Sequence, residues 1–312
     1  IFKGGSGAGL NLSRIRSSKE LLSSGGTASG PVSFMRGADA SAGTIKSGGA
    51  TRRAAKMVVL DVDHPDIREF IWCKAKEEDK AEALAKAGFD MSIDGDGFTS
   101  IQYQNANNSV RVTDAFLKAV KDDADWALIR RTDGKTAKTV KARELWDQIG
   151  HAAWACADPG IQFHDTVNAW HTCPADGPIR GSNPCSEYMF LDDTACNLAS
   201  MNLLTFLGNG KFDAEAYVHA TRLWTVTLEI SVLMAQFPSE RIAELSYRFR
   251  TLGLGYANVG GLLMTMGLPY DSDAGRALGG ALTAEARDSL VEHLARVYEP
   301  RVDVADDLGR GD

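Results

Sequence analysis

The hydrophobic and polar positions of this chain form short apolar runs that alternate with longer stretches of helical periodicity. Residues 57–60 are a continuous apolar run, which predicts a short buried strand ending at a turn. Helical spacing of apolar residues then covers 66–86, and Pro65 suits the first turn of that helix. Residues 98–112 hold two short alternating runs around a polar Asn-Ala-Asn-Asn stretch, which predicts strand and loop.

The same alternation continues along the rest of the sequence. Thr113 or Asp114 caps a short helix, and a hairpin with Asp133-Gly134 at its turn follows. Further helices are predicted at 142–158, 213–236, 239–249, 253–267 and beyond about residue 285. The helix at 213–236 is expected to be buried along the face that carries Tyr217, Ala220, Leu223, Trp224, Thr227 and Ile230. Strands separated by helices favour an α/β architecture with a mostly parallel sheet.

Residues 1–56 are rich in glycine, serine and other small residues. Linkers share this composition, but basic residues and apolar anchors interrupt it here, so we expect ordered loops that approach a ligand closely. The two basic clusters are Arg14, Arg16 and Lys19, and Arg52, Arg53 and Lys56. A solvated surface is the usual reason for such charges, but the flanking glycines favour phosphate binding and hence a nucleotide. Gly7 and Gly9 by themselves fit a turn better than a known nucleotide loop.

Composition narrows the class of protein. The 312 residues suffice for one large α/β domain or two small ones, and 44% hydrophobic with 24% charged residues is typical of a globular protein. A formal net charge of −7 argues against a nucleic-acid surface. No apolar run is long enough to cross a bilayer, so a cytoplasmic protein without membrane contact is predicted. The six histidines show no metal-ligand spacing, and no metal site is expected.

The residues with the clearest chemical content lie at 181–203, where Cys185 stands between Asn183 and Glu187 and Cys196 follows. A cysteine nucleophile needs a base, whereas a neighbouring carboxylate disfavours the thiolate. The group instead suits a neutral thiol or a thiyl radical acting on a polyol. In that chemistry Glu187 accepts a hydroxyl proton and Asn183 orients the neighbouring hydroxyl. A loop whose cysteine simply packs into a core is the alternative.

Asn-Pro-Cys-Ser-Glu followed by Ala-Cys-Asn-Leu-Ala-Ser-Met-Asn-Leu resembles the catalytic chain of ribonucleotide reductases. Proline before the cysteine and the 11 positions from Cys185 to Cys196 resemble the adenosylcobalamin-dependent class II enzymes. Other segments match in family order, among them GSGAGLNLSRIR, SGGATRRAAKMVVLDVDHPDI and TLGLGYANVGGLLMTMGLPYDSD. The resemblance covers roughly residues 1–282, as a partial catalytic barrel. Residues 283–312 diverge, as a truncated or misread tail would.

The resemblance implies part of a ten-stranded α/β barrel with a central finger loop that carries Cys185 at its tip. Cys185 would be the thiyl-radical residue that takes the 3′ hydrogen of the ribose. Glu187 would accept the 3′-hydroxyl proton, and Asn183 would hydrogen-bond the substrate hydroxyls. After the 2′-hydroxyl leaves as water, two thiols would reduce the product precursor and end in a disulfide. Cys196 would be one of them, and the other is expected upstream of residue 1.

The resemblance also implies binding partners. Gly7 and Gly9 would lie against the ribonucleotide substrate, and segment 47–55 matches the loop that relays effector identity. The basic residues assigned to this effector loop are Arg52, Arg53 and Lys56. Deoxynucleotide and ATP effectors, a thioredoxin-like or dithiol reductant and adenosylcobalamin are expected, with a homodimer among the expected assemblies. The cofactor would supply the radical by homolysis of its cobalt–carbon bond.

Other classes of protein stay open on the sequence. A class I reductase large chain, which depends on a metal-radical subunit, shares the fold, although Pro184 and the short cysteine spacing argue against it. A glycyl-radical enzyme needs a C-terminal motif that this chain does not show. A non-catalytic nucleotide-binding regulator would need neither cysteine, and a papain-like hydrolase would need a histidine paired with Cys185. The isolated chain is expected to be a fragment that folds poorly and is inactive, because an unclosed barrel exposes strand edges.

Overall fold

The computed structural model describes residues 6–45 and 55–307, the side chains of 290, 291 and 293–307 excepted. The chain divides into two compact units, Ile1–Asp192 and Asp193–Asp312, and each is described by itself. Within the described residues, no helix combines the length and the apolar character that a membrane span requires.

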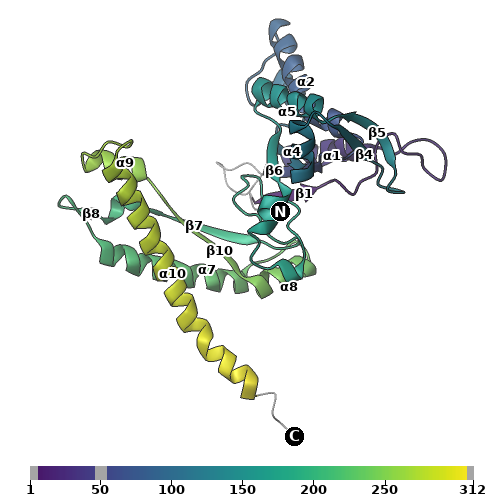
Figure 1. Ribbon diagram of the computed structural model, residues 1–312. Helices are drawn as coiled ribbons and strands as arrows, with labels where there is room; N and C mark the ends of the chain where they lie inside the picture. The colour runs from purple at the N-terminus through teal and green to yellow at the C-terminus, as the bar shows by residue number, and fades with distance from the viewer. Residues whose placement is uncertain (1–5, 46–54, 308–312) are drawn as a thin grey trace. The chain divides into compact units, whose positions relative to one another are not determined.

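The first unit is built on a parallel four-stranded sheet with the order β1-β2-β3-β6. Figure 1 labels its two edge strands, β1 and β6. The strands are β1 (Gly7–Asn11), β2 (Ala55–Asp61), β3 (Ala106–Val112) and β6 (Gly160–Phe163). The helices are α1 (Gly30–Thr44), α2 (Ile67–Lys86), α3 (Asp96–Thr99), α4 (Asp114–Lys121), α5 (Ala142–Cys156), α6 (His164–Ala169) and the 3-10 turn η2 (Pro174–Asp176). An antiparallel hairpin, β4 (Asp125–Ile129) and β5 (Thr136–Lys141), completes the unit.

One face of this sheet carries the hydrophobic core. Successive side chains of a strand point to opposite faces, so Val58 and Leu60 of β2 lie on the same face as Val110 of β3. These residues pack with Phe70 of α2 and Leu145 of α5, and all five are at most 1% exposed. Helices that connect parallel strands cover the sheet in this way. The opposite face of the sheet is therefore available to pack against the segment that follows β6.

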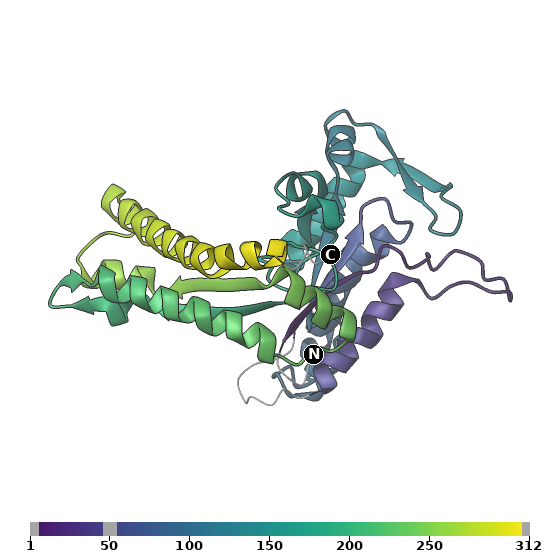
Figure 2. The ribbon, with the colours of Figure 1, turned by 90° about the horizontal axis from the view of Figure 1, so that it is seen from below.

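The second unit contains a parallel pair of strands, β7 (Cys196–Asn202) and β10 (Thr251–Ala257). Its other elements are η3 (Leu203–Phe206), β8 (Leu207–Gly208), β9 (Lys211–Phe212), α7 (Ala214–Met234), α8 (Glu240–Phe249), α9 (Val259–Thr265) and α10 (Asp273–Asp307). Helix α7 contacts both strands and runs beside α10 (Figure 2). A small core of Met201, Leu203, Tyr217, Leu262 and Leu282 holds these elements together.

Most of the predicted elements are confirmed. The run at 57–60 is the centre of β2, the periodic segment at 66–86 is α2, and the Asp133-Gly134 turn joins β4 to β5. Thr113 caps α4, since its hydroxyl accepts a hydrogen bond from the amide of Phe116 at 3.2 Å. The parallel sheet of the first unit confirms the α/β architecture.

Four predictions of local structure are wrong. Residues 7–11 form a strand and residues 30–44 form a helix, not loops. The prediction failed because the small residues of these segments leave no clear hydrophobic periodicity in the sequence. Residues 98–103 contain the end of α3 and turns, not a strand. Residues 253–257 are strand β10, not the first part of a helix, because pairing with β7 overrides the local pattern.

The buried face of α7 also differs from the prediction. Tyr217 is buried as expected, but Leu223, Trp224 and Ile230 are 55%, 43% and 48% exposed. The face that packs inside the second unit is that of Tyr217, Thr221, Thr225, Leu228 and Val232. Helix α7 is apolar nearly all round, so periodicity alone did not distinguish its two apolar faces.

Candidate functional site

Cys185 lies in a tight turn. The carbonyl of Asn183 accepts a hydrogen bond from the amide of Ser186 at 3.1 Å, which closes a β-turn with Pro184 at its second position. Asparagine first and proline second are preferred in such turns. Cys185 is absent from the residues of positive φ, as a type I turn requires, whereas Ser186 has a φ of +66° and redirects the chain. The local sequence thus places an exposed thiol at the third position of the turn.

The turn belongs to residues 179–189, which we call the cysteine segment. This segment passes over β1, with Ser182 against Gly9 and Pro184 against Gly7, so it runs in the direction opposite to the strand. A Cβ atom at Gly9 would lie 1.9 Å from the carbonyl oxygen of Ser182, and one at Gly7 would lie 2.7 Å from Cδ of Pro184. Only glycine permits so close an approach. The two glycines therefore create the space that the segment occupies.

Polar side chains on the same face of the sheet hold the cysteine segment in place. Three hydrogen bonds run from Asn11 to the carbonyl of Arg180 (2.6 Å), from Asn107 to the carbonyl of Pro184 (2.7 Å) and from Gln162 to the hydroxyl of Ser182 (2.8 Å). The donors come from β1, β3 and β6. Their strand register places them on the face opposite to the core. One face of the sheet thus packs on helices, and the other binds the cysteine segment.

Asn183 and Glu187 offer complementary groups beside Cys185. The side-chain oxygen of Asn183 accepts a hydrogen bond from the amide of Tyr188 at 3.0 Å, which fixes the orientation of the amide group. No described residue accepts a hydrogen bond from its NH₂ group. Glu187 is exposed and has no hydrogen-bond partner among the described residues. The turn therefore presents an amide donor, a carboxylate acceptor and a thiol.

The exposed thiol excludes the alternative in which Cys185 simply packs into a core. Within the described part of the chain, no histidine forms a hydrogen bond with Cys185, so the pairing of a papain-like hydrolase is not seen. Cys196 belongs to the second unit, where it begins β7 and is half-buried. No disulfide joins any of the five cysteines, all of which lie in the described part of the chain.

Cys73 contrasts with Cys185. It is buried on α2, donates to the carbonyl of Phe70 at 3.1 Å, and accepts from the side chain of Asn108 at 3.4 Å. Burial raises the pKa of its thiol to about 12. Its burial and hydrogen bonds indicate a structural role for Cys73.

We expect Cys73 to resist alkylation in the folded protein at pH 8. With a pKa of about 12, its thiolate population is about a thousandfold smaller than that of an ordinary cysteine. Labelling by iodoacetamide, followed by peptide mass mapping, should modify Cys185 and leave Cys73 intact until the protein unfolds. Equal labelling of the two cysteines would contradict the buried position of Cys73.

The basic residues assigned to the effector loop have different outcomes. Arg52 and Arg53 lie outside the described residues. Lys56 is fully buried, and its ammonium group contacts the carboxylate of Asp39 on α1 at 2.8 Å. Burial lowers the pKa of Lys56, and the Asp39 carboxylate opposes that shift. Lys56 is thus an internal cation that ties β2 to α1, and its part in effector relay stays a prediction.

We expect Asp39→Ala to destabilise the first unit by about 3–5 kcal/mol, because it leaves the Lys56 ammonium buried without a partner. The amide of Asn105, which donates to Asp39 at 3.1 Å, would lose its acceptor as well. Hydrogen exchange of the β2 amides should report the loss. The control is Asp133→Ala, which breaks an exposed ion pair with Arg130. It should change the free energy of opening of the β2 amides by less than about 1 kcal/mol. Similar effects of both substitutions would contradict this role of Asp39.

His164 and His171 are engaged inside the first unit. Nδ1 of His164 accepts a hydrogen bond from Nε of Arg111 at 2.9 Å, and Nε2 of His171 lies 2.9 Å from the carbonyl oxygen of Gly177. In the described ranges, no three His, Cys, Asp or Glu side chains are grouped so that they could hold a metal ion.

The sequence analysis missed the residues that position the cysteine segment. The missed residues are Asn11, Asn107, Arg111, Gln162 and Asn168. Most of them are polar residues in short parallel strands, where buried strands are usually apolar on both faces. Polar positions that alternate with apolar ones in Ser-Val-Arg-Val and Gly-Ile-Gln-Phe were therefore a usable signal for a second, polar sheet face.

Comparison with known proteins assigns this arrangement. Residues 1–293 match the family described as ribonucleotide reductase, barrel domain. The chain belongs to this reductase family. Its parallel strands and covering helices are those of part of an α/β barrel.

Three relatives illustrate the similarity. The chain is 65% identical over 289 residues to the vitamin B12-dependent ribonucleotide reductase of Streptomyces coelicolor, covering 91% of the chain and 30% of the relative. It is 52% identical to the protein of the same name from Bradyrhizobium diazoefficiens, covering 91% and 28%. It is 34% identical over 302 residues to the vitamin B12-dependent ribonucleoside-diphosphate reductase of Mycobacterium tuberculosis, covering 96% and 40%. The reductase chain thus spans about a third of the length of these relatives.

Proposed function

We propose that this chain is the part of a cobalamin-dependent ribonucleotide reductase that carries the radical cysteine and reduces ribonucleotides to 2′-deoxyribonucleotides for DNA synthesis. The observation that carries the proposal is the turn at 183–186. It places an exposed Cys185 thiol between an unengaged amide donor on Asn183 and the exposed carboxylate of Glu187. A radical reaction at a vicinal diol requires these three groups: a thiol that takes a hydrogen atom, a carboxylate that accepts a hydroxyl proton, and an amide that binds a hydroxyl.

Each residue has one role in the proposed reaction. Cys185, as a thiyl radical, takes the 3′ hydrogen of the ribose and returns it at the end. Glu187 accepts the 3′-hydroxyl proton, which helps the 2′-hydroxyl to leave as water. The NH₂ group of Asn183 donates to a substrate hydroxyl, for which its fixed orientation prepares it. The two electrons of the reduction come from Cys196 and a second thiol, which together form a disulfide.

The cofactor proposal rests on the environment of Cys185. Its thiol is exposed and forms no hydrogen bond with any described residue, so this side of the turn is open to a bulky group. The chemistry expected of adenosylcobalamin, if bound beside Cys185, would be to supply the radical through homolysis of its cobalt–carbon bond. The task of the chain itself is to keep Cys185 fixed, which the contacts of the cysteine segment with the sheet support.

The remaining assignments are part of the same proposal. We assign deoxynucleotide and ATP effectors to the loop of Arg52 and Arg53, which the buried Lys56 of β2 follows, and a thioredoxin-like or dithiol reductant to the cysteine pair. Gly7 and Gly9 contact the cysteine segment directly. Any contact of these glycines with the substrate would therefore be made at the edge of that segment. A partial barrel over 1–282, a homodimer and a cytoplasmic location stay predictions.

The test is deoxynucleotide formation by the complete reductase polypeptide that carries this chain. The assay contains a ribonucleotide, a dithiol and adenosylcobalamin as the only radical source, with a parallel assay that lacks the cobalamin. Turnover that requires cobalamin supports the proposal. Turnover only after addition of a metal-radical subunit would assign the chain to class I. Nucleotide binding without turnover under either condition would favour a regulator.

We also propose that the chain by itself is inactive. Strands β6 and β1 are the two edges of the four-stranded sheet, and open edges favour association over a stable monomer. A cooperative thermal transition together with turnover by residues 1–312 alone would refute this.

A further inference from the structure

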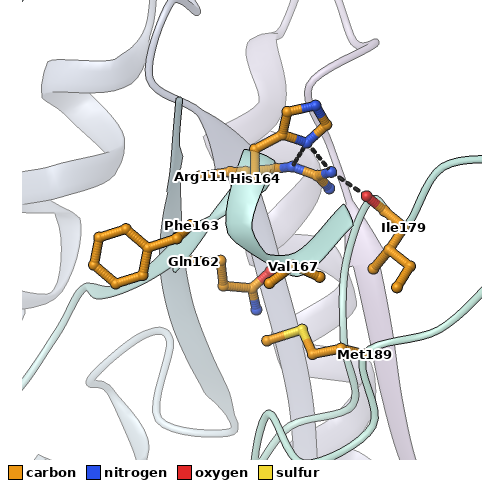
Figure 3. Close-up of a pocket in the computed structure, with 7 residues that line it drawn as sticks. All are labelled: Arg111, Gln162, Phe163, His164, Val167, Ile179 and Met189. Carbon is orange, nitrogen blue, oxygen red and sulfur yellow. Dashed lines mark hydrogen bonds between the residues drawn. The ribbon is translucent and has the colours of Figure 1, made fainter. Parts of the chain in front are cut away.

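The cysteine segment begins and ends beside the same group of side chains. Ile179 and Met189, which we call the neck of the segment, both line a narrow depression at the end of β3 and the start of α6 (Figure 3). The rest of its lining is formed by Arg111, Gln162, Phe163, His164 and Val167. The depression has no room for a water molecule, so these groups pack directly against one another.

Arg111 is the central residue of the neck. It is only 6% exposed, and burial lowers the pKa of its guanidinium group, which nevertheless stays charged. Among the described residues no carboxylate forms an ion pair with it. Its donors go instead to Nδ1 of His164 and to the carbonyl oxygen of Ile179. The carboxylates of Asp61, Asp192 and Asp165 favour its charged form without forming an ion pair, so no direct salt bridge offsets the cost of its burial.

Asn168 also binds the backbone of Ile179. Its side-chain oxygen accepts from the amide of Ile179 at 2.9 Å, and its NH₂ group donates to the carbonyl of Ile179 at 3.1 Å. This pair of bonds imitates the pairing of a neighbouring strand. The NH₂ group also donates to the carbonyl of His164 at 2.9 Å, so α6 and the neck move as one piece.

His164 completes the network. Its Nδ1 accepts from Nε of Arg111, and therefore carries no proton in this arrangement. The imidazole holds the guanidinium plane so that Nη2 points at Ile179, as Figure 3 shows. The carbonyl of Ile179 thus receives two donors, one charged and one neutral.

We propose that Arg111, together with His164 and Asn168, clamps the neck of the cysteine segment and so sets the position of the Cys185 thiol. The inference rests on the proposed role of Cys185 in hydrogen-atom transfer. Ile179 and Cys185 are joined by a short extended chain that is bonded to the sheet at Arg180, Ser182 and Pro184. A shift of the neck is therefore transmitted to the turn. Arg111 is a positioning residue, since it acts through Ile179.

The clamp predicts a specific kinetic pattern in the complete reductase. We expect Arg111→Ala to lower kcat by at least about 30-fold and to leave KM for the ribonucleotide within about threefold, because misplacing the thiol by about 1 Å costs transition-state geometry. Arg111→Lys keeps the positive charge but loses the planar pair of donors of the guanidinium group. Its kcat should therefore lie between those of Arg111→Ala and the wild type. Asn168→Ala removes neutral hydrogen bonds only and should lower kcat by about tenfold. Arg130→Ala, at an exposed hairpin ion pair, is the matched control.

A second measurement does not depend on turnover. Hydrogen exchange of residues 179–189 should accelerate in Arg111→Ala, while the β4–β5 hairpin of the same unit keeps its wild-type exchange. A kcat within about threefold of wild type in both Arg111→Ala and Asn168→Ala would overturn the proposal. Faster exchange across the whole first unit would also overturn it, since it would indicate a general structural role. If the wild-type protein shows no turnover, the proposed function is wrong. The hydrogen-exchange experiment would still show whether Arg111 holds the neck of the cysteine segment in place.

Discussion

We expect Cys185→Ser to abolish deoxynucleotide formation by the complete reductase, with a loss of at least about a thousandfold. Serine fits the same turn, because the third position of a type I turn accepts either residue and the side chain is exposed. The O–H bond is stronger than the S–H bond, so the hydroxyl cannot carry the radical. Ribonucleotide and effector binding should stay within about threefold of wild type, since Asn183 and Glu187 are unchanged.

The matched control for this substitution is Cys173→Ser. Cys173 is a free, half-buried cysteine of the same unit, and we assign it no role in the reaction. Its replacement should leave turnover within about twofold of wild type. Product formation is followed by separating ribonucleotides from deoxyribonucleotides, and binding by equilibrium dialysis. Turnover that survives Cys185→Ser would remove the basis for the site described above.

Gly9→Ala should reduce kcat by about a hundredfold, although it adds only one methyl group. The new Cβ would lie 1.9 Å from the carbonyl oxygen of Ser182, whereas ordinary contacts between carbon and oxygen are about 3.3 Å or longer. The obstacle is backbone, so no side-chain rotation relieves it. The cysteine segment must therefore move away from β1 by more than about 1 Å, and Cys185 moves with it.

Gly150→Ala provides the control for the added methyl group. Gly150 lies in α5, and a Cβ at this position would meet nothing within 4 Å. Alanine is the better helix former by about 1 kcal/mol, so stability should be equal or higher and kcat unchanged. The measurements are kcat with adenosylcobalamin and the hydrogen exchange of residues 179–189. A wild-type kcat in Gly9→Ala would contradict this prediction. It would show that β1 moves to accommodate the methyl group while the cysteine segment keeps its position.

The hydrophobic pattern predicted the elements that are long or strongly periodic. The apolar run of β2, the periodic α2 and the turn of the β4–β5 hairpin each carry their signal within a few neighbouring residues. Strand β10 does not, because its glycines and tyrosine form a strand only when β7 lies beside them. Helix α1 was missed for a related reason. Its small residues are buried against β2 and α2 without forming an obvious apolar stripe.

The candidate site shows the same division. Asn183, Cys185 and Glu187 were selected from the sequence because they lie within five positions, and their chemistry follows from residue types. Gly7 and Gly9 were selected from the family resemblance as residues beside the substrate, but the structure gives them a different immediate contact, the backbone of the cysteine segment. Arg111 and Asn168 were not selected at all. They act on Ile179 from positions 68 and 11 residues away, and no local pattern encodes that meeting.

The sequence by itself determined the grouping of Asn183, Cys185 and Glu187, the reductase resemblance and the alternation of strands and helices, because each depends on neighbouring residues or on order along the chain. Only the tertiary structure decided which sheet face is polar, that glycines at 7 and 9 admit the cysteine segment, and that a buried guanidinium holds its neck. The physical reason is that hydrogen bonds and close backbone contacts depend on atoms within a few ångströms. Segments that are remote in sequence are brought to that distance only when the parallel sheet aligns its strands.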